Sequence, residues 1–254
     1  MAGGVLIELR GVGVHRGRRA VLRDVDLRLA GGDAVHLAGA NGSGKTSLLR
    51  VVAGLASPRA GTVARHAACA FTPERARLAP ALRGAEWLEA MRRLRGGAPV
   101  DWAAAATASG LDPAALHAPS ATLSKGMLQR LALLDALHAP AATLILDEPF
   151  SGLDAGARDW LAARLTARRA GGAAVLLTDH DGAIEGPMAT TATVRLQDGR
   201  AVASGTTAAA APTVAIVATY PDGRRAEERV AATAVDARLR ALLDAGWHIE
   251  RVAP

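Results

Sequence analysis

The chain has 254 residues, enough for one large domain or for a main domain with an appendage. Its formal net charge of +6 comes from scattered arginines, without a basic run or interleaved aromatic residues, so no nucleic-acid partner is expected. Half of the residues are hydrophobic, which supplies a sizeable core, and the single Cys69 excludes an internal disulfide and suits a reducing compartment.

Neither the N-terminus nor residues 201–220 indicates a membrane segment. The N-terminus lacks a positive region followed by an apolar core, so it does not resemble a signal peptide. Residues 201–220 carry no charge, but they are rich in Ala and Thr and lack Leu and Phe. We expect a linker followed by a strand there, and a chain that is soluble by itself.

The first 38 residues alternate between apolar and polar positions. This pattern predicts strands of an antiparallel sheet with turns at Gly17 and Gly31–Gly32. Further short strands are expected after the first helix. The predicted strands of this region are 5–9, 21–22, 25–29, 62–65 and 68–71.

A glycine-rich loop follows the apolar strand Val35–Ala38 and opens a helix that ends before Gly54. Gly39, Gly44, Lys45 and Thr46 fit the phosphate-binding pattern G-x-x-x-x-G-K-[ST]. In such a loop, backbone N–H groups and the helix dipole bind phosphate oxygens, Lys45 reaches the β- and γ-phosphates, and Thr46 binds Mg²⁺. The chain has only one other lysine, Lys125. The expected nucleotide contacts here are Gly39, Ala40, Asn41, Gly42, Ser43, Gly44, Lys45, Thr46 and Ser47.

Residues 82–138 are predicted to be mostly helical, with helices over 83–95, 102–109 and 124–138. The last of these begins with Leu123-Ser-Lys-Gly-Met, in which Ser124 is a good N-cap. Gly126 in the first turn is costly for a helix, and this favours a ligand that approaches the backbone at that point.

The apolar strand 143–146 ends in Asp147 and Glu148. An acid at the carboxyl end of a strand beside a phosphate loop can hold Mg²⁺, which is the role expected of Asp147. Glu148 is placed to act as the base that polarises the attacking water, although a pair of acids before Pro149 is also good turn chemistry.

Strands and helices alternate after Glu148, which predicts an α/β fold with a parallel sheet. The expected elements are a helix over 155–170, a strand over 174–178, a short helix from Asp181 and two strands within 192–204. Beyond Gly205 the pattern changes to strands near 214–218, 230 and 247–252 with a helix over 234–245. We therefore predict a main domain over residues 1–205 and a small α+β extension over 206–254.

The motifs together resemble the ATP-binding subunit of an ATP-binding cassette (ABC) transporter. The resemblance covers about residues 5–205, and it adds Ser151-Gly-Leu-Asp154 and His180 to the motifs above, in the family's order. It implies a P-loop ABC cassette with a parallel core, an antiparallel N-terminal β subdomain and a helical subdomain near 75–138. It also implies a head-to-tail dimer, in which Ser124 and Gly126 of one chain contact the γ-phosphate bound by the other.

The same resemblance assigns further roles and shows three departures. Asp154 would couple the two sites of the dimer, and His180 would contact the γ-phosphate and the attacking water. Where the family usually has an adenine-stacking aromatic, this chain has His15 and Arg16, of which Arg16 is the preferred candidate. Glu74 replaces the usual Gln as a Mg²⁺ ligand that faces the membrane partner.

The third departure is Lys125 and Met127 in the signature, which resembles the subset that serves ABC-2 type exporters. The implied function is Mg²⁺-dependent ATP hydrolysis that drives a separate integral membrane permease, for export, with a second copy of the chain or a paralogous subunit. The expected location is cytoplasmic, at the inner face of the cell membrane. A haem-exporter ATPase, which shares Leu-Asp-Glu-Pro-Phe at 146–150, and a soluble cassette ATPase for iron–sulfur assembly remain alternatives. The set Lys45, Asp147, Glu148 and His180 argues against a regulatory sensor that binds ATP without hydrolysing it.

Overall fold

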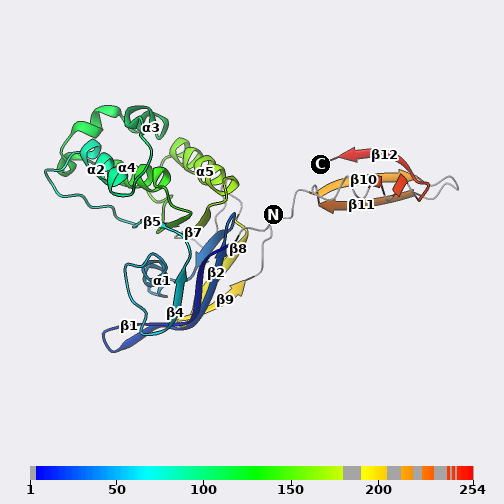
Figure 1. The fold of residues 1–254 in the computed structure, drawn as a ribbon, viewed down its shortest axis with the longest axis horizontal. Helices are drawn as coiled ribbons and strands as arrows, with labels where there is room; N and C mark the ends of the chain where they lie inside the picture. The colour runs from blue at the N-terminus through cyan, green and yellow to red at the C-terminus, as the bar shows by residue number, and fades with distance from the viewer. Residues whose placement is uncertain are drawn as a thin grey trace. The chain divides into compact units, whose positions relative to one another are not determined.

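A computed structural model describes residues 4–179, 190–204, 213–219, 225–231, 239–240, 242–243 and 245–253. The chain forms two compact units, residues 1–206 and 207–254 (Figure 1). His180, the predicted helix from Asp181 and much of the predicted helix 234–245 lie outside the described residues. No helix within the described ranges combines the length and the apolar character needed to cross a membrane.

An antiparallel sheet of three strands, in the order β2-β1-β4, forms the N-terminal part of the first unit. Its strands are β1 (Val5–Arg16), β2 (Arg19–Ala30) and β4 (Ala60–Arg65). The expected antiparallel subdomain is therefore present, but the predicted strands 21–22 and 25–29 are one continuous strand. Asp24, at φ 52°, interrupts its regular alternation, which explains why the sequence suggested two pieces.

The central sheet has six strands in the order β5-β6-β7-β3-β8-β9. These are β5 (Cys69–Thr72), β6 (Thr143–Leu146), β7 (Ala174–Thr178), β3 (Ala34–Ala38), β8 (Ala192–Gln197) and β9 (Arg200–Ser204). Neighbouring strands are parallel up to β8, and β9 returns antiparallel around Asp198 and Gly199. All residues of β3, β6 and β7 are buried, as expected for strands covered on both faces. The predicted α/β fold is confirmed.

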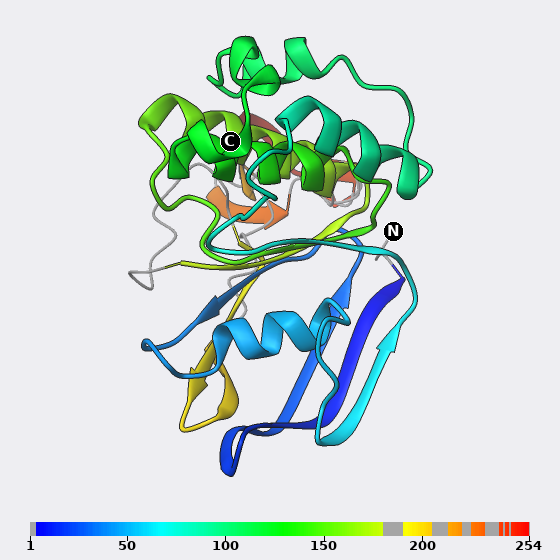
Figure 2. The ribbon, with the colours of Figure 1, turned by 90° about the vertical axis from the view of Figure 1, so that its left-hand side faces the viewer.

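Helices cover both faces of the central sheet (Figure 2). On one face, α1 (Lys45–Val52) packs with Val35 and Leu37 of β3, between this sheet and the antiparallel one. On the other face, α4 (Lys125–His138) and α5 (Ala155–Ala170) pack with Val175 and Leu177 of β7. Because all these strands point the same way, their carboxyl ends meet at the edge where β3 leads into α1.

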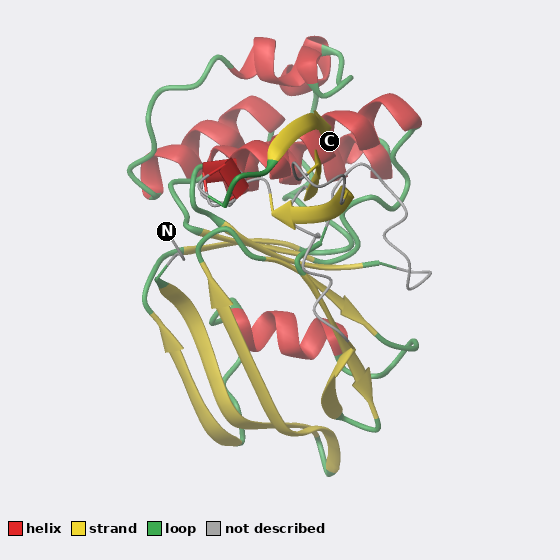
Figure 3. Ribbon diagram, turned by 90° about the vertical axis from the view of Figure 1, so that its right-hand side faces the viewer, coloured by secondary structure: helices red, strands yellow, loops and turns green. Residues whose placement is uncertain are grey.

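A helical subdomain lies between β5 and β6 in sequence, and Figure 3 shows several helices gathered on one side of the central sheet. It contains α2 (Gly84–Leu94), α3 (Trp102–Ala108), the 3₁₀ turns η1 (Pro113–His117) and η2 (Ser120–Thr122), and the start of α4. Leu88, Leu116 and Leu131 form the centre of its core. This subdomain matches the helical region predicted from the sequence.

The second unit contains a three-stranded antiparallel sheet with β10 (Thr213–Thr219) between β11 (Arg225–Ala231) and β12 (His248–Ala253). Residues 239–240 and 242–243 are helical. Leu242 is buried against Leu239, Trp247 and Ile249. Strands and helical residues thus occur where the sequence pattern placed them.

Candidate functional site

The glycine-rich loop connects β3 to α1, and its backbone requires glycine at two close approaches. Gly39 has φ 151°, and a Cβ there would lie 2.8 Å from the Leu196 carbonyl oxygen and 2.6 Å from Ser43 Oγ. Gly44 has φ 107°, and a Cβ there would lie 2.7 Å from Leu22 Cδ2. The loop is therefore held against β8 and the N-terminal sheet, while its tip at residues 40–42 is exposed.

The N-terminus of α1 has the features of an anion site. Gly44 is its N-cap, no side chain caps its N–H groups, and its first turn contains no acid. In contrast, Ser124 and Asp154 cap α4 and α5 with side-chain oxygens that accept from Met127 N at 3.2 Å and Ala157 N at 2.9 Å. The free N–H groups and the dipole of α1 are thus available to phosphate oxygens.

Lys45 is buried, with 8% of its surface exposed, and it folds over the loop. Its Nζ donates to the carbonyl oxygens of Gly39 at 2.6 Å and Ala40 at 3.4 Å. A positive charge therefore lies inside the curve of the loop, next to the N-terminus of α1. Burial lowers the pKa of the neighbouring His36 on β3 below its ordinary value.

Thr46 and Asp147 join the first helix to the end of β6. Thr46 Oγ1 donates to Asp147 Oδ2 at 2.8 Å, although the two residues are far apart in sequence. A hydroxyl and a carboxylate that converge beside a phosphate loop offer the hard oxygen ligands that Mg²⁺ prefers. The residues present therefore fit a magnesium ion.

Thr178, the last residue of β7, connects the two acids of the site and was missed by the sequence analysis. Its Oγ1 donates to Asp147 Oδ1 at 2.8 Å and accepts from Glu148 N at 2.8 Å. Glu148 is 8% exposed and has φ 50°, an unusual conformation for a residue with a side chain. The sequence did contain a signal for Thr178, because it ends a strand predicted to be parallel to the strand before Asp147. The carboxyl ends of such strands lie at the same edge of the sheet.

Ser124, Gly126 and Asp154 form a second group. Ser124 is exposed at the N-terminus of α4, and a Cβ on Gly126 would approach the carbonyl oxygen of Gly152 at 3.7 Å. Asp154 forms an ion pair with Arg130 of α4, another residue that the sequence analysis did not single out. The hydrogen bond from Ala157 N lowers the pKa of Asp154, and the Arg130 charge acts in the same direction. The loop before α5 and the first turns of α4 are thus joined.

The structure places the remaining predicted site residues as follows. Arg16 is exposed at the end of β1, on the hairpin whose Val21 and Leu22 contact Gly44. Glu74 follows β5, half-buried, with an ion pair of 3.4 Å to Arg75. His180 cannot be placed because it lies outside the described residues.

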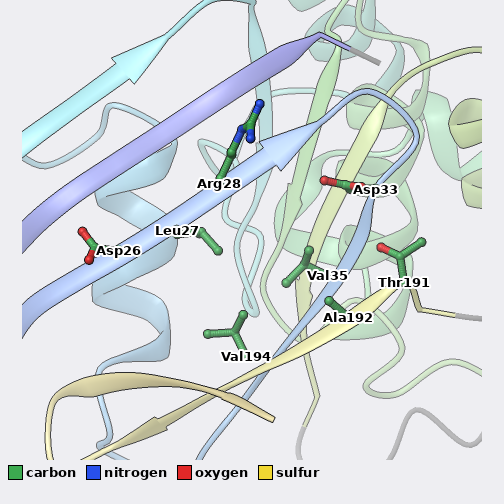
Figure 4. A pocket seen from close by; sticks show the side chains of 8 residues that line it. All are labelled: Asp26, Leu27, Arg28, Asp33, Val35, Thr191, Ala192 and Val194. Atoms are coloured by element: carbon green, nitrogen blue, oxygen red, sulfur yellow. The ribbon is translucent and has the colours of Figure 1, made fainter. Parts of the chain in front are cut away.

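A separate cavity of about 330 Å³ lies between β2, β3 and β8 (Figure 4). Both of its carboxylates accept local backbone hydrogen bonds: Asp26 Oδ1 accepts from Gly11 N at 2.7 Å, and Asp33 Oδ2 accepts from Ala30 N at 2.7 Å. The lining residues are Asp26, Leu27, Arg28, Asp33, Val35, Thr191, Ala192 and Val194. None of the predicted nucleotide contacts lines this cavity.

Comparison with known proteins identifies close relatives. The family model described as "ABC transporter" matches residues 22–151. The "Cytochrome c biogenesis ATP-binding export protein CcmA" of Rhodopseudomonas palustris (strain BisB5) is 37% identical over 180 residues, which cover 67% of this chain and 90% of the relative. The protein of the same name from Sphingopyxis alaskensis is 38% identical over 183 residues, covering 69% and 90%.

Solved structures show the same fold. The "Structure of ATP binding subunit of ABC transporter" has a TM-score of 0.71 and 27% identity, and the match covers 80% of this chain and 90% of that one. The "ATP-binding cassette MJ0796 bound to ADP and Pi", a dimer, has a TM-score of 0.67 at 22% identity, covering 77% and 96%. The resemblance inferred from the sequence motifs is confirmed: this chain belongs to the ABC transporter family and is an ATP-binding subunit with ATPase activity.

Proposed function

We propose that this chain hydrolyses ATP with Mg²⁺ between two cassettes and thereby drives a separate membrane permease for export. The observation that carries the proposal is the 37–38% identity to cytochrome c biogenesis export proteins over 90% of their length. This likeness favours the haem-exporter form of the function over a general ABC-2 exporter. The second cassette is another copy of this chain or a paralogous subunit.

The phosphates of ATP would be bound by the loop from Gly39 to Ser47. The uncapped N–H groups of α1 face this position, and Lys45 would exchange its loop carbonyl partners for the β- and γ-phosphates. Arg16, on the hairpin beside the loop, would stack on adenine through its planar guanidinium. Triphosphate binding therefore depends mainly on the loop.

Mg²⁺ would be held by Thr46 and Asp147, with Glu74 contributing from the loop after β5. When bound, this ion neutralises charge that develops on the β- and γ-phosphate oxygens. Asp147 is already oriented by two hydroxyls, which makes its carboxylate a fixed ligand. Glu74 would also contact the membrane subunit.

Hydrolysis would use Glu148 as the base that accepts a proton from the water attacking the γ-phosphate. The resemblance to the family assigns His180 to the same water and phosphate. Glu148 is buried at the end of β6 and turned by its left-handed backbone, which gives it a defined position. The products are ADP and phosphate.

The second cassette would complete the site with Ser124 and Gly126, and Asp154 would couple the two sites of the dimer. Support comes from Gly126, because a Cβ added there would meet only the carbonyl oxygen of Gly152, at the ordinary contact distance of 3.7 Å. The glycine is better explained by a ligand that approaches from outside the chain.

We further propose that residues 1–205 form the cassette, that 206–254 form an extension, and that the protein is a cytoplasmic subunit at the inner face of the membrane. The test is to tag the chain, extract native membranes in mild detergent and identify co-purifying proteins by mass spectrometry. A polytopic protein at roughly equal stoichiometry is expected, and its presence should stimulate ATP hydrolysis. A soluble iron–sulfur scaffold without any membrane protein above background would instead support a non-transport role.

A further inference from the structure

Thr178 occupies a central position between the two acids of the site. It is fully buried at the end of β7, whose parallel pairing with β6 places Leu177 beside Leu146. Its hydroxyl has one hydrogen to donate, which goes to Asp147 Oδ1, and it accepts the Glu148 N–H. Both bonds measure 2.8 Å. A hydroxyl can donate one hydrogen bond and accept others, so Thr178 can form both bonds at the same time.

The bond to Glu148 N fixes the peptide unit that precedes the proposed base. Glu148 has φ 50°, a conformation that a residue with a side chain adopts only where surrounding contacts hold it. A buried N–H group also requires a partner, and Thr178 supplies it. The direction of the Glu148 side chain therefore depends on a hydroxyl from the neighbouring strand.

The bond to Asp147 acts on the proposed magnesium ligand. The Asp147 carboxylate accepts one hydrogen bond from the Thr46 hydroxyl and one from the Thr178 hydroxyl. The Asp147 N–H donates to Thr72 O at 2.9 Å. A continuous chain of hydrogen bonds thus runs from the first turn of α1 through Asp147 and Thr178 to Glu148. The two hydroxyls donate to different oxygens of the Asp147 carboxylate, so the bond from Thr178 does not depend on the bond from Thr46.

We propose that Thr178 is a positioning residue for ATP hydrolysis, which sets the orientation of Glu148 and Asp147 without touching the nucleotide. This inference rests on the proposed function. It assigns a role to the end of β7 immediately before Asp179 and His180. If Thr178 had only a structural role, it would provide hydrogen bonds to the Asp147 carboxylate and the Glu148 N–H without affecting the rate of hydrolysis.

The test compares Thr178→Val, which keeps the shape and removes both hydrogen bonds, with Thr178→Ser, which keeps the hydroxyl. The matched control is Thr143→Val, the same change at a fully buried position in β6, at the opposite end of that strand from the acids. Thr178→Ala is measured in parallel in case valine prevents folding. Each variant is assayed for kcat, KM, ATP affinity with and without Mg²⁺, and Tm.

We expect Thr178→Val and Thr178→Ala to lower kcat about 10- to 100-fold, because hydrolysis slows when Glu148 and Asp147 are not held in the productive orientation. ATP affinity without Mg²⁺ should stay within about twofold of wild type, because the phosphate loop is unchanged. Thr178→Ser should recover most of kcat, and Thr143→Val should keep it.

Wild-type kcat in folded Thr178→Val or Thr178→Ala would overturn the inference. So would a fall in kcat that Thr143→Val reproduces, or one that Thr178→Ser fails to rescue. Failure of the proposed function would look different, since the wild-type chain itself would then show no Mg²⁺-dependent hydrolysis.

Discussion

Lys45 is proposed to bind phosphate and Glu148 is proposed to act as the base, so replacing each residue should affect a different step. Lys45 Nζ lies within the phosphate loop, where its charge is available to bound phosphates. Glu148 is buried directly after Asp147, and as the proposed base it would act on the attacking water and contribute little to nucleotide affinity.

At the residue scale we therefore predict that Lys45→Ala weakens ATP binding about 10- to 100-fold, the loss expected for charge-assisted hydrogen bonds.

Glu148→Gln should bind ATP normally and lower kcat about 100-fold or more, because an amide cannot accept the proton. Equilibrium dialysis with ATP and a phosphate-release assay measure the two effects. Normal turnover in Glu148→Gln would remove Glu148 from the role of base.

At the scale of elements, the helix N-termini differ in whether a side chain caps their N–H groups. The N-termini of α4 and α5 are closed by Ser124 and Asp154, whereas α1 is left open towards the phosphate loop. Other contacts join one helix to the next. Glu89 of α2 accepts from Arg92, from Arg93 and from Trp102 of α3, which ties these two helices together.

The arginine partners lower the pKa of Glu89 from 4.5 to about 2. A depressed pKa means that the carboxylate stabilises the folded state above the ordinary pKa and loses that contribution as the pH falls towards the folded value. We predict that Glu89→Gln lowers Tm at pH 7 and pH 5 by similar amounts, and that the difference from wild type shrinks at pH 3. Thermal unfolding followed by circular dichroism checks this, and an equal difference at every pH would contradict it.

The main elements of the cassette could be predicted from the sequence because periodicity and glycine positions are local signals. The strand before Gly39, the N-cap at Ser124 and the two acids after Leu146 all lie where the pattern placed them. The continuity of β2 could not be predicted, because the irregularity at Asp24 interrupts its alternation. Pairing with β1 nevertheless continues on both sides of Asp24.

The contacts of the site were less predictable than its residues. Thr46 and Asp147 could be assigned to one ion from their motifs, but their direct hydrogen bond depends on the packing of α1 against β6. Thr178 and Arg130 act only through side chains that are remote in sequence. Such partners become visible when the order of strands and helices is known.

At the scale of the whole molecule, the chain separates into a large and a small unit. The three main hydrophobic clusters lie entirely within the first unit, and the small unit has its own cluster around Leu242. Among the described residues, the members of these three clusters all lie before residue 206.

We predict that a chain ending at Thr206 folds cooperatively and binds ATP with an affinity within about twofold of the full chain, because the phosphate loop and its supporting strands are retained. Thermal unfolding and nucleotide titration of the shortened and full chains give the comparison. A shortened chain that aggregates or lacks a cooperative transition would show that the extension belongs to the cassette core.

The two lysines give this protein an unusual chemical property. Lys45 is 8% exposed within the phosphate loop, whereas Lys125 is exposed next to Ser124. Apart from the N-terminus, these are the only amines of the chain, and they mark the two halves of the proposed composite site. If the proposed composite site forms, acylation of Lys45 should fall when nucleotide binds, and acylation of Lys125 should fall when the second cassette covers it.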